Sequence, residues 1–170
     1  MTNSDYYIGL ISGTSVDGVD CALVQFEGNQ PKLIASHCEA IDPDLRETIL
    51  QLCSGKNIDL ELLGTTDIAI GQLFAKGVAT LLAKQTVEKS SILAIGSHGQ
   101  TVFHHPVGDT RFSLQMGDPN SIAQRTGITT VADFRRRDMA ADGEGAPLAP
   151  LLHRNCFQSA STDRVVLNVG

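Results

Sequence analysis

Residues 6–26, YYIGLISGTSVDGVDCALVQF, contain two apolar segments on either side of a polar, glycine-rich turn. The apolar segments cover 6–11 and 19–26, and this pattern is typical of two strands joined by a turn. A second turn at 28–31 leads into a third short apolar segment, 32–38. Three consecutive strands joined by tight turns predict an antiparallel meander.

Downstream of residue 40 the pattern changes to alternating helices and strands. Asp42-Pro43 and Asp118-Pro119 each place an N-cap residue before a proline at the first helical position, which predicts helices that end near 54–55 and at Gly127. Residues 58–85 predict one long helix or two broken helices, because each interior glycine costs about 1 kcal/mol. The other expected elements are a strand over 92–95 that leads into the segment 96–99, a hairpin of 101–103 with 112–115, a strand over 128–131, a loop over 132–147 and a helix ending near Cys156. This order predicts an α+β or α/β layer with helices on the faces of a sheet.

The last seven residues, 164–170, are RVVLNVG and predict an apolar strand that ends in a glycine. Such a strand needs partners, and chain termini usually lie at the periphery of a domain. We therefore expect a truncated chain, with one complete domain over 1–163 and the first strand of a second domain over 164–170.

Composition limits the classes of function. The 170 residues include 13 Lys+Arg and 19 Asp+Glu, a formal charge of −6, which disfavours a nucleic-acid binder. The chain has no apolar run of about 20 residues, and its start is polar, so we expect a cytoplasmic protein without a membrane partner. Cysteines occur singly at 21, 38, 53 and 156, which indicates reduced core thiols rather than disulfides or a zinc site.

The turn between the first two strands is a candidate phosphate-binding loop. Its small residues allow a close approach of the backbone, its glycines supply positive φ, and its amides and hydroxyls suit phosphate oxygens. Asp17 and Asp20 suit Mg²⁺ bound through water beside those phosphates, although no GK[ST] of a Walker motif follows. An ordinary hairpin turn is an equally weighted interpretation. The candidate residues are Gly13, Thr14, Ser15, Val16, Asp17, Gly18, Val19 and Asp20.

A second candidate site lies at 96–101, GSHGQT, where the expected strand ends. Open α/β sheets place their ligand crevice at the carboxyl ends of strands, and His98 and Gln100 suit hydrogen bonds to a polar substrate. A metal site that includes His104 and His105 is disfavoured, because adjacent histidines in a strand point to opposite faces.

Three consecutive arginines, Arg135, Arg136 and Arg137, form the third candidate site. Arginine pairs bidentately with carboxylate or phosphate, so this run suits an anionic group of a substrate. On the residues alone, a solvated charge run held by Asp133 and Asp138 is the slightly favoured alternative.

Five segments, in this order and at these distances, resemble the N-terminal half of the anhydro-N-acetylmuramic acid kinase family: ISGTSVDGVD, AIGSHGQTVFHHP, SLQMGDPNSIA, VADFRRRDMAADGEGAPLAP and the terminal LNVG. The resemblance covers essentially the whole chain. It implies membership of the superfamily of sugar kinases, heat-shock chaperone ATPases and actin, in which two ribonuclease-H-like domains hold ATP in the cleft between them. The expected fold is therefore an α/β, ribonuclease-H-like (actin-like ATPase) domain, and 164–170 would open the second domain.

The resemblance also implies a reaction and roles for the candidate residues. The family opens the 1,6-anhydro ring of anhydro-N-acetylmuramic acid with water and phosphorylates the 6-oxygen from ATP, in cell-wall recycling. By position, 13–20 would bind the ATP phosphates with Mg²⁺ held through water by Asp17, and His98, Gln100 and 135–137 would face the sugar, with an arginine on its lactyl carboxylate. The general base would be an aspartate beyond Gly170, so we expect this chain alone to be inactive.

Three alternatives to this kinase remain open. The chain could be a non-catalytic binding fragment, or part of a kinase for another sugar. A ribonuclease-H-like nuclease would hold two Mg²⁺ ions about 3.5–4 Å apart between clustered carboxylates, for which only Asp17 and Asp20 are early candidates. We also expect that an exposed apolar cleft face favours a homodimer.

Overall fold

A computed structural model of the chain describes residues 5–167. The strands are β1 (Tyr6–Ser12), β2 (Gly18–Glu27), β3 (Gln30–Ala40), β4 (Ile92–His105), β5 (Phe112–Met116) and β6 (Thr130–Ala132). The helices are α1 (Pro43–Ser54), α2 (Leu60–Ala83), α3 (Pro119–Thr126), α4 (Phe134–Met139) and α5 (Pro150–Phe157), with a short 3-10 turn at Lys89–Ser91. The α/β class expected from the sequence is confirmed.

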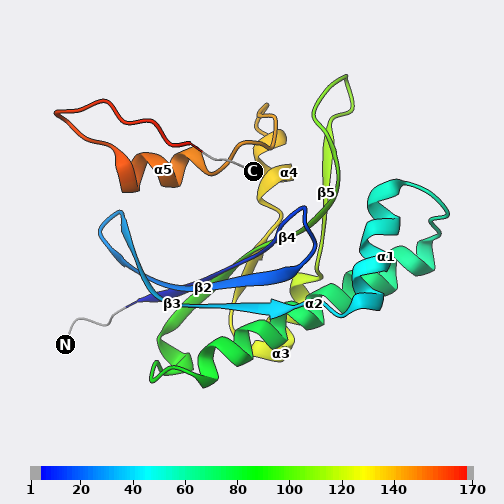
Figure 1. Cartoon of the computed structure of the whole chain (residues 1–170), viewed down its shortest axis with the longest axis horizontal. Coiled ribbons are helices and arrows are strands. Elements are labelled where there is room, and N and C mark those ends of the chain that lie inside the picture. Colours follow the sequence, from blue (N-terminus) through cyan, green and yellow to red (C-terminus); the bar gives the residue numbers. More distant parts are fainter. Residues whose placement is uncertain (1–4, 168–170) are drawn as a thin grey trace.

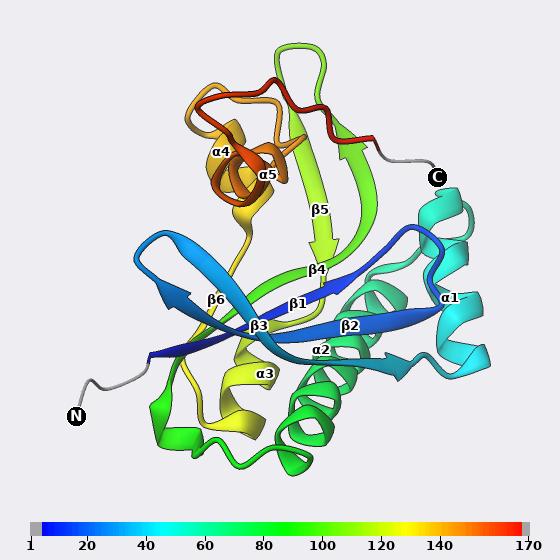
Figure 2. The same cartoon turned by 60° about the vertical axis from the view of Figure 1, so that its left-hand side comes forward.

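The strands form one mixed sheet in the order β3-β2-β1-β4-β5, and β6 pairs with β4 beside β5. Neighbours in β1–β3 are antiparallel, β4 runs parallel to β1, and β6 runs parallel to β4. Helices α2 and α3 cover one face of the sheet, α1 lies at one end, and α4 and α5 lie over the opposite face (Figures 1 and 2). The carboxyl end of β6 leads directly into α4, which also contacts β5.

The core lies between the sheet and α2. Every second residue of a strand points toward this helix, and these residues are mainly apolar. The largest fully buried apolar side chains are Ile8, Leu23, Ile49, Ile70, Phe74, Leu81, Ile95 and Ile122.

The segment over 58–85 forms the single helix α2, despite its glycines. A Cβ at Gly71 would lie 2.7 Å from the Asp118 carbonyl oxygen, and one at Gly77 would lie 2.7 Å from Cys21 Sγ. These two glycines allow α2 to approach α3 and the sheet closely. The packing gained there offsets the cost of glycine in a helix.

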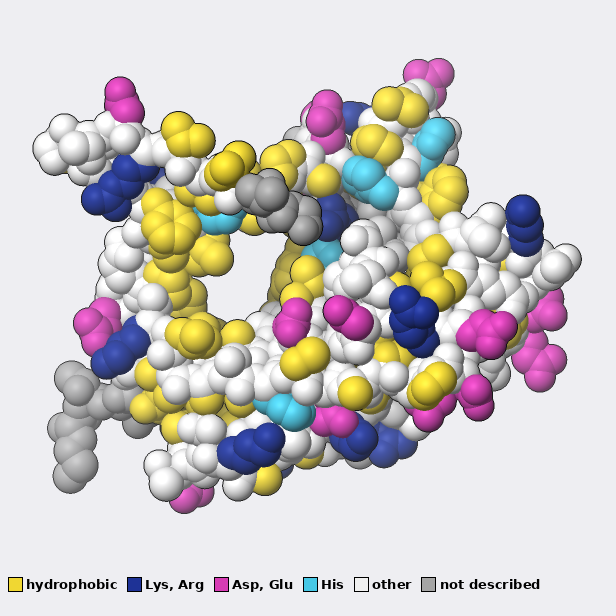
Figure 3. Space-filling view, viewed as in Figure 1, with side chains coloured by type: hydrophobic (Ala, Val, Ile, Leu, Met, Phe, Trp, Pro, Cys, Tyr) yellow, Lys and Arg dark blue, Asp and Glu magenta, His cyan; other side chains and the backbone are white. Residues whose placement is uncertain are grey.

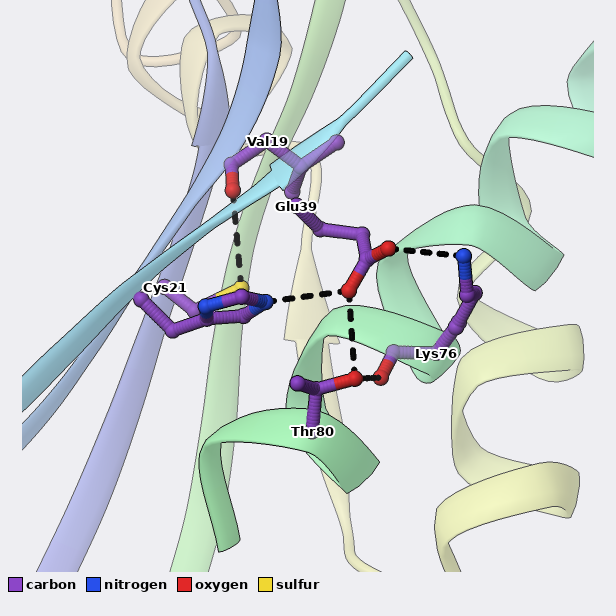
Figure 4. Close-up of polar contacts among 6 residues, drawn as sticks. Val19, Cys21, Glu39, Lys76 and Thr80 are labelled. Carbon is purple, nitrogen blue, oxygen red and sulfur yellow. Dashed lines mark hydrogen bonds and ion pairs between the residues drawn. The ribbon is translucent and has the colours of Figure 1, made fainter. Parts of the chain in front are cut away.

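A saturated polar cluster joins β3 to α2 (Figure 4). The Glu39 carboxylate, which is 8% exposed, accepts hydrogen bonds from Lys76 Nζ (2.7 Å), His37 Nε2 (3.0 Å) and Thr80 Oγ1 (3.1 Å). The hydrogen bonds from Lys76 and His37 lower the pKa of Glu39 to about 2, against the opposing effect of its burial. We call these four residues the Glu39 cluster.

Some expected boundaries are wrong. Strand β4 continues through 96–99, beyond the expected end at residue 95; Gly99 takes φ +78°, and the pairing of β4 with β1 shifts register there. The expected loop over 132–147 contains α4, so the arginine run lies on a helical turn. The expected strand over 128–131 is confined to Thr130–Ala132.

The terminal strand expected over 164–170 stays a prediction, whereas the expectation of core thiols needs correction. Residues 164–167 pair with no strand among the described residues, and 168–170 lie outside the part of the chain that the structure describes. Of the four free cysteines, only Cys21 is buried, whereas Cys38 and Cys53 are exposed and Cys156 is partly buried. The last three lie on an edge strand and on helix surfaces, where apolar neighbours in the sequence do not imply burial.

Candidate functional site

The loop between β1 and β2, residues 13–17, has an unusual backbone at Val16. This residue takes φ +51°, which is rare for a β-branched side chain, and its side chain is buried. Its amide donates to the Gly13 carbonyl at 3.2 Å. The expectation that glycines supply the positive φ in this loop is wrong, because Val16 supplies it while burial anchors its side chain.

Arg46 of α1 donates hydrogen bonds to two carbonyl groups of this loop. Its Nε donates to the Val16 carbonyl at 2.9 Å, and its Nη2 donates to the Ser15 carbonyl at 3.2 Å. Two donors on one rigid guanidinium restrict both peptide units. Arg46 therefore stabilises a strained conformation, a feature that is common at functional sites.

The eight candidate loop residues separate into two groups. Gly13, Thr14, Ser15, Asp17 and Asp20 are exposed, whereas Val16, Gly18 and Val19 are buried. Ser15 Oγ donates to Asp17 Oδ1 at 2.9 Å, at the exposed tip of the loop. A Cβ at Gly18 would overlap Cys38 Sγ, so Gly18 serves the close approach of β2 to β3.

Gln100 lies beneath the loop rather than at the surface. It is fully buried, its Oε1 accepts from Ser12 Oγ at 2.6 Å, and its Nε2 donates to the Thr101 carbonyl at 3.0 Å. In this structure the side chain cannot reach a ligand. It instead joins the end of β1, where the loop begins, to β4.

A pocket of about 190 Å³ lies beside β4, at the end of the sheet that α4 covers. Segments from β4, β5, β6, α2, α3 and α4 form its walls. We call it the β4–α4 pocket; its lining residues are Asp67, Ser97, His98, Gly99, Gln115, Met116, Gly117, Pro119, Ala132, Asp133 and Arg136. The structure thus brings His98 and Arg136 together, as two of the predicted sugar-facing residues.

His98 uses both ring nitrogens within the chain. Its Nε2 accepts from Arg135 Nε at 2.8 Å, and its Nδ1 lies 3.0 Å from the Gly99 carbonyl oxygen, which accepts the Nδ1 proton. Burial lowers the pKa of His98; the bond to Gly99 opposes that shift and the Arg135 guanidinium adds to it. The neutral imidazole therefore contributes a ring face to the pocket, and its nitrogens position Arg135.

The three arginines of the run have different surroundings. Arg135 is committed to His98 and to the Gly145 carbonyl, to which its Nη1 donates at 2.9 Å. Arg136 pairs bidentately with Asp133 at 2.8 and 2.7 Å and lines both the β4–α4 pocket and an adjoining hollow. Arg137 lines a separate groove. Arg136 is thus the arginine of the run at the pocket.

The adjoining hollow has a volume of about 280 Å³ and contains a second arginine, Arg111, besides Arg136. Asp109 is the acidic side chain in its lining. The Arg111 side chain also contacts the glycine loop that follows α4, with its Nη2 3.8 Å from Asp142 Oδ1. Two guanidinium groups on one hollow suit a carboxylate.

An apolar groove of about 580 Å³ lies on the far side of α4, beneath α5. Its lining includes Val131, Phe134, Leu148 and Leu151, and all four side chains are substantially exposed. Figure 3 shows an opening between the sheet and the α5 segment, lined mainly by hydrophobic side chains.

Sequence reasoning missed three pocket residues: Asp67, Ser97 and Gln115. Asp67 lies in the N-terminal third of α2, and its Oδ1 accepts a hydrogen bond from the Gly117 amide at 2.6 Å. Ser97 Oγ and Gln115 Oε1 are buried and have no hydrogen-bond partner among the described residues. Ser97 could have been predicted, because it lies within the GSHGQT segment. The sequence around Asp67 and Gln115 does not indicate that these two residues lie next to Ser97.

Neither a cluster of metal ligands nor a membrane-spanning helix occurs in the described part of the chain. Residues 5–167 contain no group of three or more His, Cys, Asp or Glu side chains placed to hold a metal ion. None of the helices described there is both long and apolar enough to cross a membrane.

Comparison with known proteins identifies relatives along the whole chain. A family model described as "Anhydro-N-acetylmuramic acid kinase" matches residues 5–170. The curated protein of that name from Shewanella pealeana is 51% identical over 168 residues, 99% of this chain and 46% of the relative. Those from Shewanella sp. strain ANA-3 and Shewanella baltica strain OS185 are each 52% identical, over 99% and 97% of this chain and 46% and 45% of the relatives. The chain thus spans about half the length of these relatives.

Proposed function

Because this chain belongs to the anhydro-N-acetylmuramic acid kinase family, we propose that it contributes the sugar-binding and phosphate-binding half of an ATP-dependent sugar kinase. The proposed reaction adds water across the 1,6-anhydro bond of anhydro-N-acetylmuramic acid and transfers the γ-phosphoryl group of ATP to the 6-oxygen. The products are N-acetylmuramic acid 6-phosphate and ADP. The observation that carries this proposal is the family match over 5–170, which contains all three candidate sites.

The architecture supports a ribonuclease-H-like domain over 1–163. Three antiparallel strands followed by two strands parallel to β1, in the order β3-β2-β1-β4-β6, are the arrangement expected of that fold. We propose that 164–170 open a second domain that covers the apolar groove beneath α5. In the isolated chain the same exposed surface favours association with a second copy.

The β1–β2 loop is the proposed site for the ATP phosphates. Its exposed Gly13, Thr14 and Ser15 offer backbone amides and hydroxyls, and Arg46 and the buried Val16 hold its shape. Mg²⁺ usually keeps several waters and binds through one or two carboxylates together with phosphates, so the exposed Asp17 fits a water-mediated contact. When bound, the ion would neutralise charge on the transferred phosphoryl group.

The β4–α4 pocket is the proposed site for the sugar ring. The pocket and the phosphate loop are connected through β4. Gly99 lines the pocket, and the next residue, Gln100, hydrogen-bonds Ser12, where the loop begins. Arg136 and Arg111, which share the adjoining hollow, are placed to receive the lactyl carboxylate. Arg135 and His98 position this wall of the site.

This chain then supplies positioning rather than proton transfer. The general base, proposed as an aspartate of the second domain, would deprotonate the attacking water while the sugar 6-oxygen receives the phosphoryl group. Positioning the 6-oxygen next to the γ-phosphate accounts for much of the rate acceleration in such phosphoryl transfers. A role in cytoplasmic cell-wall recycling follows from this substrate and from the use of ATP.

The test compares this chain with an extended protein, in which residues 1–170 are followed by the remaining half of the Shewanella pealeana relative. ADP release is measured with anhydro-N-acetylmuramic acid, with N-acetylmuramic acid and without sugar. We expect anhydro-sugar-dependent ADP release by the extended protein and none by the 170-residue chain. A folded extended protein that phosphorylates neither sugar would overturn the proposal; a preference for the second sugar would favour the alternative of another substrate.

A further inference from the structure

The exposed side of helix α2 carries no charge between Glu61 and Lys76. Residues 62–75 include one charged residue, Asp67, and its carboxylate accepts a hydrogen bond from the Gly117 amide inside the fold. The exposed residues of this interval are Gly64, Thr65, Ile68 and Gln72. The outward face of a helix normally carries charged as well as polar side chains, so a face without charge over this length favours a partner on this side of α2.

A hollow of about 430 Å³ lies on the same face, near the start of the helix. We call it the α2 hollow; its lining residues are Leu60, Glu61, Gly64, Thr65 and Ile68. The last four occupy positions i, i+3, i+4 and i+7, which are the four positions that surround a side chain inserted from a facing helix. A Cβ at Gly64 would meet no atom within 4 Å among the described residues, so the centre of the hollow is open. The α2 hollow therefore suits a side chain of a second helix.

Two copies of this face complement each other when the helices run antiparallel. With a two-fold axis between Ile68 and Ala69, residues at equal distances from the axis face each other across the pair. The facing pairs, each formed twice, are Glu61 with Lys76, Thr65 with Gln72, and Ile68 with Ala69. Opposite charges thus lie at both ends of the contact, and uncharged side chains lie between them.

The charges at the two ends favour this orientation. A parallel pair would place Glu61 beside Glu61 and Lys76 beside Lys76, whereas the antiparallel pair joins unlike charges. Lys76 Nζ donates to Glu39 within its own chain at 2.7 Å, but the Lys76 side chain is 67% exposed and an ammonium group has three N–H donors. It can therefore contact a carboxylate of a second copy without leaving Glu39.

We propose that this face of α2 binds the same face of a second copy of the chain, as an antiparallel helix pair. The α2 hollow of each copy then receives the Gln72 side chain of the other. Helix α2 lies on the opposite side of the sheet from α4 and α5, so this surface is separate from the apolar groove beneath α5 (Figures 1 and 2). The contact spans about 22 Å of helix and is small, so we expect a dissociation constant of about 10–100 µM.

This inference goes beyond the proposed function. None of the facing residues lines the β4–α4 pocket or belongs to the β1–β2 loop. The experiments below measure association alone and need neither ATP nor sugar, so their outcome is distinguishable from a failure of the proposed kinase activity.

Thr65→Cys combined with Gln72→Cys tests both the pairing and its register. Within one helix these two positions are about 10 Å apart, whereas a disulfide requires Cα atoms less than about 7 Å apart, so the bond cannot form within one chain. Across the proposed pair the two positions face each other twice. After mild oxidation near the expected dissociation constant, we expect a covalent dimer on a non-reducing gel and a peptide linked through 65 and 72 by mass spectrometry.

The two single variants, Thr65→Cys and Gln72→Cys, are the matched controls. Both retain the natural cysteines at 21, 38, 53 and 156, so any cross-link through those thiols occurs in all three proteins. In the proposed pair the two copies of position 65 lie about 10 Å apart, and so do the two copies of position 72. Neither single variant is therefore expected to form a dimer through its new cysteine. Equal yields of covalent dimer in the single and double variants would overturn the proposal.

Glu61→Lys in the double-cysteine protein tests the charge pairing. It places a lysine opposite Lys76 at both ends, so we expect the yield of the 65–72 link to fall about threefold or more at low salt. Glu47→Lys makes the same charge change on the exposed surface of α1 and should leave the yield unchanged. Melting temperatures of both variants report whether the fold is retained. Equal losses of yield in two folded variants would overturn the proposed pairing.

The same double-cysteine protein is then tested with the second half present. We expect the 65–72 link in the extended protein as well. A link that forms in the 170-residue chain and is absent from the folded extended protein would show that the second half covers this face of α2, and it would overturn the proposal.

Discussion

Two regions of the sheet, the β3 edge and the part of β4 and β5 beside the β4–α4 pocket, bury polar side chains with different hydrogen bonding. At the β3 edge, the Glu39 carboxylate accepts three hydrogen bonds from its own cluster. Beside the β4–α4 pocket, Ser97 Oγ of β4 and Gln115 Oε1 of β5 receive none from residues 5–167. Buried polar groups are nearly always satisfied, so the first arrangement is complete in the folded chain, whereas the second leaves hydrogen-bonding positions for water or a ligand. The difference distinguishes a closed structural cluster from a pocket with open polar positions.

The largest expected effect on stability comes from a substitution in the Glu39 cluster. Glu39→Gln removes the charge that Lys76 and His37 pair with, and hydrogen bonds to charged groups contribute about 1.5–3 kcal/mol each. We expect the free energy of unfolding, measured by urea denaturation, to fall by about 1.5–3 kcal/mol. Sugar affinity should not change.

The exposed Glu47 on α1 provides the matched control for that substitution. Glu47→Gln should shift the free energy of unfolding by less than about 0.5 kcal/mol. If Glu39→Gln behaves like Glu47→Gln, the cluster does not stabilise the fold and the contrast between the two regions fails.

The pH dependence of stability gives a second test at the same edge. The pKa of Glu39 is about 2 in the folded chain and 4.5 as its ordinary value, so the stabilisation is complete above pH 4.5 and is lost as the pH falls toward 2. Thermal melting over this interval should show a steeper loss in the unsubstituted chain than in Glu39→Gln. Parallel curves for the two proteins would assign the acid sensitivity to other carboxylates.

An intermediate effect is expected at the β1–β2 loop, whose carbonyls are satisfied by Arg46. Arg46→Ala removes the donors to Val16 and Ser15, and we expect a stability loss of about 1–2 kcal/mol. If the loop binds ATP phosphates, KM for ATP in the extended protein should rise while KM for the sugar stays within twofold. Equal changes in both KM values would indicate a general loss of structure.

The smallest effect is expected at His98. Its folded pKa lies below the ordinary 6.5, so stability falls as the pH decreases from 6.5 through that lowered pKa. Protonation also prevents Nε2 from accepting the Arg135 hydrogen bond. Sugar affinity of the extended protein should therefore weaken modestly below pH 6.5, and His98→Gln should flatten that dependence. A pH profile that His98→Gln leaves unchanged would contradict this role.

Local signals in the sequence were sufficient for much of the fold. Asp42-Pro43 and Asp118-Pro119 predicted the starts of α1 and α3, and Gly55 and Gly127 predicted their ends, because capping depends on adjacent residues. The continuation of β4 beyond residue 95 was not predicted, since Gly99 is also compatible with the end of a strand and its close approach to Met116 of β5 is distant in sequence. Helix α4 was missed because it is a single short segment, opened by Asp133 at φ +65°.

The candidate site was less accessible to sequence reasoning. His98 and Arg136 were expected together and both line the pocket, but Gln100, two residues from His98, is buried beneath the loop because the bulge reverses the alternation of side chains. Asp67 and Gln115 join the pocket through contacts that are distant in sequence, such as the bond from the Gly117 amide to Asp67. No periodicity or spacing reports such contacts.

The most direct test is a crystal structure of the extended protein with anhydro-N-acetylmuramic acid, at a resolution that orients its acetamide. We expect the ring in the β4–α4 pocket, with the carboxylate toward Arg136. A sugar bound outside this pocket would contradict the account.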